Sequence, residues 1–121
     1  MTLVEWEVLP AYERDAICAK TVMGWQYEDE DKLWWVPGDG KGMVRVGEFR
    51  PVSNRNDTAL LLDEIYLLAK PARIAFDDAL YTATPRGEEW EYELNILRSS
   101  PSLLSYCAVT ACEKEKEEHA T

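Results

Sequence analysis

The chain of 121 residues contains a single histidine, His119. Histidine is the usual base of nucleophilic triads, the usual acid–base group near neutral pH and a common zinc ligand. Its scarcity argues against all three kinds of site. We therefore predict that the protein is not an enzyme and that it has no catalytic residues, no metal site and no cofactor.

Cysteine is also scarce, with only Cys18, Cys107 and Cys112, and no pair has the Cys-x-x-Cys spacing of redox and zinc motifs. Cys107 and Cys112 are five positions apart, which does not place them on one helix face. The N-terminus lacks the basic segment and apolar run of a signal peptide. These features predict buried, reduced cysteines in a cytoplasmic protein.

Long apolar runs and an excess of basic residues are missing too. No segment reaches eighteen apolar residues, so no membrane span is expected. The net charge of −10 disfavours nucleic acid as a partner, because phosphate binding depends on Lys and Arg. Two explanations of the acidity remain open: it serves solubility, or it forms a surface that docks on a basic protein.

The length is that of one domain, and an apolar share of 46% is sufficient for a core without disulfides. We expect a single domain over 1–121 with a charged, flexible tail from about residue 113. A helix is predicted from about Pro10 to Met23, ended by Gly24, and a second from about Asp57 to Ala69. A third begins after Ser100, its expected N-cap.

Strands are predicted on both sides of the second helix. Leu33–Val36 and Met43–Val46 form an expected hairpin, and the segments Ala72–Leu80 and Trp90–Ile96 form two further expected strands. The clearest alternation of apolar and polar residues is at 90–96. The predicted fold is α+β, with three helices packed on a mostly antiparallel four-stranded sheet as an α/β/α sandwich.

Several strings, in their order, resemble the phage ABA-sandwich domain family. They are the helix that ends in Met23-Gly24-Trp25, the segment Phe49-Arg50-Pro51, and Ser99-Ser100-Pro101 before the last helix. The resemblance covers nearly the whole chain, although the loop before Asp57 is longer than in the family. It implies a small phage or prophage protein in the cytoplasm of the infected bacterial host, with no established catalytic residues to carry over.

The loop Phe49–Asp57 is the preferred ligand site. It contains two arginines in an acidic chain and leads into a helix N-terminus, which favours anions, while arginine can bind phosphate in bidentate fashion. A nearby tryptophan could stack on a base. The alternative is a capped loop whose arginines pair with surface acids. The predicted ligand-binding residues are Arg50, Ser53, Asn54, Arg55, Asn56, Trp25 and Trp35.

Other motifs have ordinary explanations. Gly38–Gly42 resembles a phosphate loop, but no Ser or Thr follows Lys41 and no helix comes next, so a hairpin turn is expected. The carboxylates at 77–78 and 91–93 are expected to lie on a solvated strand face. Strand alternation sends Trp34 and Trp35 to opposite faces, so that one is core and the other is free to stack, unless all the tryptophans are buried.

Two functions follow as hypotheses. The first is a counter-defence protein that sequesters a small nucleotide-like signalling ligand, in a pocket that can also form between subunits of a homo-oligomer. The second is an acidic inhibitor that docks on a basic host defence protein or phage partner. The first requires Arg50 and Arg55 unpaired and directed into one cavity, whereas the second requires them paired and the acids contiguous.

Overall fold

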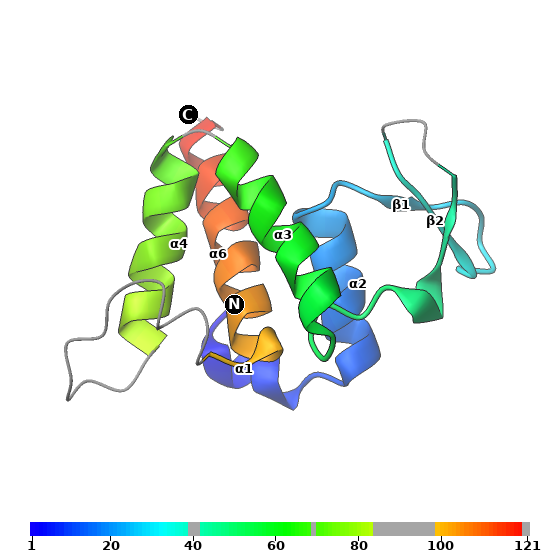
Figure 1. The fold of residues 1–121 in the computed structure, drawn as a ribbon, viewed down its shortest axis with the longest axis horizontal. Coiled ribbons are helices and arrows are strands. Elements are labelled where there is room, and N and C mark those ends of the chain that lie inside the picture. Colours follow the sequence, from blue (N-terminus) through cyan, green and yellow to red (C-terminus); the bar gives the residue numbers. More distant parts are fainter. Residues whose placement is uncertain (39–41, 69, 84–98, 120–121) are drawn as a thin grey trace.

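The computed structural model describes residues 1–38, 42–68, 70–83 and 99–119. Within these ranges it contains five α-helices, one 3₁₀ turn and three short strands. The α+β class and the antiparallel sheet are confirmed, but the predicted count of three helices is wrong. Figure 1 shows a bundle of helices with the strands at one side, next to α2 and far from α4. The described elements therefore do not form a three-layer sandwich.

The helix α1 (Leu3–Val8) was not predicted, although its start has a recognisable signal. The Thr2 hydroxyl accepts a hydrogen bond from the Glu5 N–H at 3.2 Å, and the Glu5 carboxylate accepts one from the Thr2 N–H at 3.0 Å. This reciprocal capping box satisfies two backbone donors that a short helix would otherwise leave free. The helix carries Trp6 into the core, where the side chain is fully buried.

Three helices lie close to their predicted positions. They are α2 (Ala11–Thr21), α3 (Arg55–Leu67) and α6 (Pro101–His119). After α2, Gly24 has the left-handed φ of +71° that was expected of a helix stop. The Ser100 hydroxyl accepts from the Leu103 N–H at 3.1 Å, which confirms it as the cap of α6. That helix continues through residues 113–119, where a charged tail was predicted. The flexibility of this segment stays a prediction.

The segment predicted as a strand at Ala72–Leu80 belongs to the helix α4 (Lys70–Ala83), so that prediction is wrong. The strand was inferred from Ile74, Phe76 and Leu80, but Ile74 is 49% exposed. The side chains that are buried in α4 recur at steps of three and four residues, and alanine favours helix strongly. They are Ala72, Ala75, Phe76 and Leu80. The strand predicted at 90–96 lies outside the described residues.

The sheet has the order β1-β2-β3, with antiparallel pairing throughout. The predicted hairpin is confirmed as β2 (Trp34–Val36) and β3 (Val44–Arg45), with Trp34 opposite Arg45 and Trp35 opposite Val44. An unpredicted strand, β1 (Gln26–Tyr27), pairs with the other edge of β2. The 3₁₀ turn η1 (Val46–Glu48) then leads from β3 towards the loop before α3.

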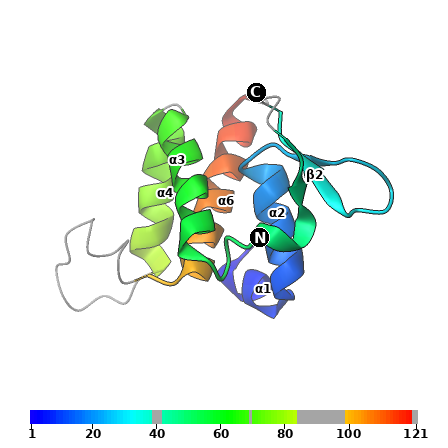
Figure 2. The same cartoon turned by 45° about the vertical axis from the view of Figure 1, so that its right-hand side comes forward.

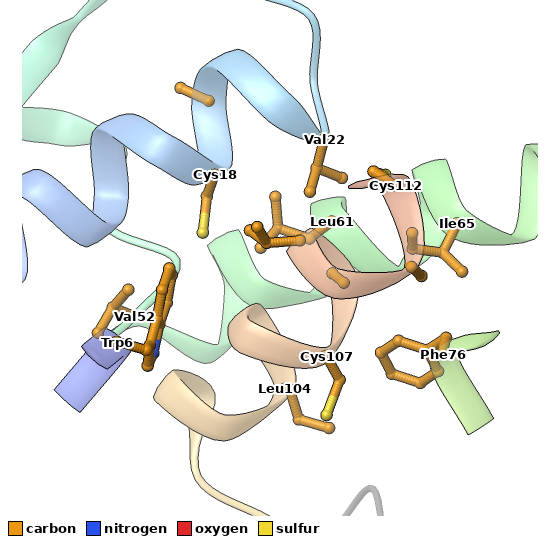
Figure 3. Packing of buried hydrophobic residues seen from close by; sticks show 14 of the residues in the cluster. Trp6, Cys18, Val22, Val52, Leu61, Ile65, Phe76, Leu104, Cys107 and Cys112 are labelled. Atoms are coloured by element: carbon orange, nitrogen blue, oxygen red, sulfur yellow. The ribbon is translucent and has the colours of Figure 1, made fainter. Parts of the chain in front are cut away.

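The core is centred on α6, which contacts α2, α3 and α4. Figure 1 shows α6 between α4 and α3, and Figure 2 shows it between that pair of helices and α2. Figure 3 shows side chains from these four helices, such as Cys18, Leu61, Phe76 and Leu104, meeting in one interior. This packing holds the first half of α2 and the loop before α3 in fixed relation to each other, which positions the site described below.

All three cysteines are buried in this core and unpaired, as predicted. Burial raises the pKa of Cys18 and of Cys107 to about 12, and that of Cys112 to about 11. A thiol with so high a pKa holds almost no thiolate at neutral pH and is a poor nucleophile. The cysteines therefore act as small apolar side chains in the packing.

Candidate ligand pocket

The loop between η1 and α3 is fixed by hydrogen bonds to its backbone. The Pro51 carbonyl accepts from the Thr58 hydroxyl of α3 at 2.6 Å and from the Ser105 hydroxyl of α6 at 3.0 Å. The Val52 N–H donates to the Asp15 carboxylate of α2 at 3.1 Å. Three helices thus hold two successive loop residues, both buried, while the side chains on either side of them remain exposed.

The N-terminus of α3 does not form the open anion-binding site that was expected there. The Asn54 side chain accepts from the Asn56 N–H at 2.9 Å and the Asp57 N–H at 3.4 Å. Asp57 also places a carboxylate in the first turn, where it accepts from the Arg50 N–H at 2.9 Å. The helix end is therefore already capped and already faces a negative charge. Two of its backbone N–H groups are occupied and the Asp57 carboxylate would repel a phosphate, so phosphate binding there is unfavourable.

The two arginines of the predicted site have different surroundings. The Arg55 guanidinium donates to the Ser99 carbonyl at 2.9 Å and so ties the start of α3 to the segment before α6. The Arg50 guanidinium forms no hydrogen bond or ion pair with any residue in the described ranges. Of the pair, only Arg50 thus meets the requirement of an unpaired cation.

A cavity of about 380 Å³ lies between the first half of α2 and the segment that follows β3. We call it the Arg50 cavity. Its lining brings together three of the seven predicted site residues, Arg50, Ser53 and Trp35, whereas Asn54, Arg55, Asn56 and Trp25 lie outside it. The full lining is Ala11, Tyr12, Asp15, Ala16, Trp35, Val46, Gly47, Arg50 and Ser53.

The two tryptophans of the predicted site have mainly packing roles. Trp25 is half-buried and packs against Phe49, with ring centroids 4.7 Å apart. Trp35 is 1% exposed and its ring stacks on Tyr27 at 4.2 Å with an interplanar angle of 16°. Neither face of the Trp35 ring is open to a base, so Trp35 forms a wall of the cavity and not a stacking platform. The expected division of the adjacent pair is confirmed, and Trp34 is its exposed member.

Six of the nine lining residues were not predicted, and Tyr12 and Asp15 are the two of them with polar side chains. Both come from a helix far along the chain from the loop. Their spacing of three places them on one face of α2. Tyr12 is 72% exposed and stands at the cavity with its ring accessible to solvent. The Tyr12 ring thus offers the aromatic surface that Trp35 lacks.

Asp15 gives the cavity a carboxylate opposite in charge to Arg50. Burial raises the pKa of Asp15 above its ordinary value of 3.8, although the Val52 N–H and the charges of Arg14 and Arg50 act in the opposite direction. One carboxylate oxygen accepts from Val52, and within the described residues the other has no partner. A ligand with both an anionic group and a hydrogen-bond donor would therefore fit this pair of side chains.

Replacing Asp15 by asparagine should stabilise the protein near neutral pH. In the wild type the folded state holds the Asp15 proton more tightly than the unfolded state, so stability is lost as pH rises from 3.8 through the raised folded pKa. Asparagine keeps the oxygen that accepts from Val52 and does not titrate. Melting curves from acidic to neutral pH should show an advantage for Asp15→Asn that grows over this interval and then levels off. The exposed Asp63→Asn is the control, and an advantage that shrinks as pH rises would contradict the assignment.

The described ranges hold no group of three or more His, Cys, Asp or Glu residues arranged to bind a metal ion. In those same ranges, no helix is both long enough and apolar enough to cross a membrane. Comparisons of the chain with protein-family models, curated proteins and solved structures found no match. The resemblance to the phage ABA-sandwich family stays a prediction.

Proposed function

We propose that the protein is a non-enzymatic binding protein that captures a small nucleotide-type ligand in the Arg50 cavity. The observation that carries the proposal is that Arg50, whose guanidinium is unpaired within the described residues, lines a cavity together with Ser53 and Asp15. A volume of about 380 Å³ lies within the range of small-molecule sites. In a chain of net charge −10, such a cation is the group expected to select an anion.

The side chains suggest how the ligand is oriented. Arg50 binds the phosphate in bidentate geometry, with Ser53 donating a further hydrogen bond. Asp15 repels the phosphate and accepts from a ribose hydroxyl or a base amino group at the other end of the ligand. The Tyr12 ring stacks on the base at the rim. The family resemblance supports a phage counter-defence role, in which the protein binds a host signalling nucleotide and keeps it from its receptor. Such a role requires tight binding and no catalytic step.

The test is calorimetry and thermal melting with a panel of cyclic AMP, a cyclic dinucleotide and ADP-ribose. A member that binds should raise the melting temperature by mass action, and chromatography should recover it unchanged. Arg50→Ala should weaken its binding roughly tenfold to a hundredfold, because each charge-assisted hydrogen bond contributes about 1.5–3 kcal/mol.

The controls use the other arginines. Arg73 is exposed on α4 at a separate cavity, so Arg73→Ala should leave nucleotide affinity unchanged. Arg55→Ala should lower stability through the lost bond to Ser99, with little effect on affinity. The fold should survive Arg50→Ala, because its backbone N–H keeps its bond to Asp57. Failure of every nucleotide to bind, or equal binding by Arg50→Ala, would disprove the proposal.

A further inference from the structure

The sheet has an inner face that is packed and an outer face that is open. Tyr27, Trp35 and Val44 lie on the inner face and pack against the core. Alternation along β2 puts Trp34 and Val36 on the outer face, where they are 38% and 40% exposed. Both side chains are thus more than a third exposed, and Figures 1 and 2 show the strands at the edge of the molecule.

The strand register gathers apolar side chains on this outer face. Trp34 stands opposite Arg45 and Trp35 opposite Val44. The same register, extended by one residue, sets Val36 opposite Met43, which is 49% exposed. We call Trp34, Val36 and Met43 the outer patch. An exposed tryptophan surrounded by aliphatic side chains is the composition typical of the centre of a protein interface.

Acidic residues border the outer patch. The Glu28 N–H donates to the Trp34 carbonyl at 3.0 Å, so the acidic run Glu28–Asp31 begins directly beside the patch. All four of its carboxylates are exposed. Three cations lie over the aromatic rings of this sheet: Arg45 is 6.0 Å from the Trp34 centroid, and Lys20 and Lys32 are 4.7 Å and 5.7 Å from the Tyr27 centroid. Four acids against three cations leave this border with a net negative charge.

We infer that the outer patch and its acidic border form a docking surface for a basic segment of another protein, one that combines Arg or Lys with apolar side chains. Apolar side chains of the partner would cover Trp34 and Val36, and its cations would pair with the Glu28–Asp31 run. Charge complementarity selects this occupant, because an acidic or nucleic-acid partner would be repelled. This surface is distinct from the Arg50 cavity, which takes Trp35 from the inner side of the same strand.

The test uses a fluorescein-labelled peptide in which Arg alternates with Leu, and a matched peptide with Glu in place of each Arg. Fluorescence anisotropy should show binding of the Arg peptide alone, with an affinity that falls as salt is added. Trp34→Ala should weaken this binding roughly tenfold or more, as expected for a central aromatic residue. Leu67→Ala removes an equally apolar side chain, 79% exposed on α3, and should have no effect.

A pair of charge variants separates local complementarity from net charge. The first variant neutralises the whole acidic run and should weaken peptide binding at least tenfold and reduce its salt dependence. It combines Glu28→Gln, Asp29→Asn, Glu30→Gln and Asp31→Asn. The control neutralises four exposed acids elsewhere, and it should bind nearly as the wild type does. The control acids are Glu7, Asp63, Asp77 and Asp78.

Three results would overturn the inference. They are wild-type affinity in Trp34→Ala, equal losses in the two charge variants, and a dimer, seen by sedimentation without peptide, that Trp34→Ala dissociates. The last result would assign the face to a second copy of the chain. The nucleotide assays do not involve this surface, so failure of either proposal leaves the other standing.

Discussion

Replacement of Trp35 by alanine should lower the free energy of unfolding by about 3–5 kcal/mol, the usual cost of removing a large buried aromatic side chain. Trp35 is 1% exposed, stacks on Tyr27 and joins the inner face of the sheet to the core. The sheet consists of strands of two or three residues, so backbone pairing alone gives it little stability. Urea denaturation followed by circular dichroism measures the change.

The neighbouring residue provides a matched control. Trp34→Ala removes the same kind of side chain from the preceding position, on the solvent side of the strand. It should lower the free energy of unfolding by less than about 1 kcal/mol. Equal costs at the two positions would mean that the faces of β2 are not assigned correctly. Trp35→Ala should also remove one wall of the Arg50 cavity, so any bound nucleotide should be lost with it.

The second large effect concerns the Pro51 carbonyl, which accepts hydrogen bonds from Thr58 and Ser105. Thr58→Val or Ser105→Ala alone leaves one donor in place and should cost about 1 kcal/mol. The double variant leaves a buried carbonyl without a partner, which adds a desolvation penalty of about 1–3 kcal/mol. Both side chains are buried, so water does not readily replace them.

A double-mutant cycle should therefore give a loss larger than the sum of the single losses. Additive losses would show that the two bonds act independently and that the carbonyl finds another donor. Because Pro51 adjoins Arg50, the double variant should also loosen the loop that carries the cation. We expect its nucleotide affinity to fall even under conditions where the protein remains folded.

Local signals were sufficient for the elements that have clear ends. Gly24 and Ser100 marked helix boundaries correctly, and the glycine-rich segment after Val36 marked the hairpin. The helix α3 was predicted to begin near Asp57, but it begins at Arg55 and its N-cap is Asn54. Asp and Asn both favour the N-cap position, so residue type alone does not choose between them. The short helix α1 could have been found from the spacing of Thr2 and Glu5.

The remaining differences arose from tertiary structure. Ile74 and Phe76 suggested alternation, but packing against α6 selected the helical stripe through Ala72, Ala75 and Leu80. For the same reason the sequence could nominate Arg50 and Ser53 but not Tyr12 or Asp15. Only the contact of α2 with a loop some forty residues later brings these four together. The hydrogen bond that occupies the Arg55 guanidinium likewise could not be predicted, because its acceptor, the Ser99 carbonyl, belongs to a distant segment.

The central position of α6 has a consequence for biosynthesis. During translation α2, α3 and α4 leave the ribosome before the helix on which all three pack has been made. Their apolar stripes stay uncovered until residues 101–112 emerge, because short isolated helices are only marginally stable in water. The nascent chain should therefore be protease-sensitive and bind holdase chaperones until late in its synthesis, and then fold in one cooperative step.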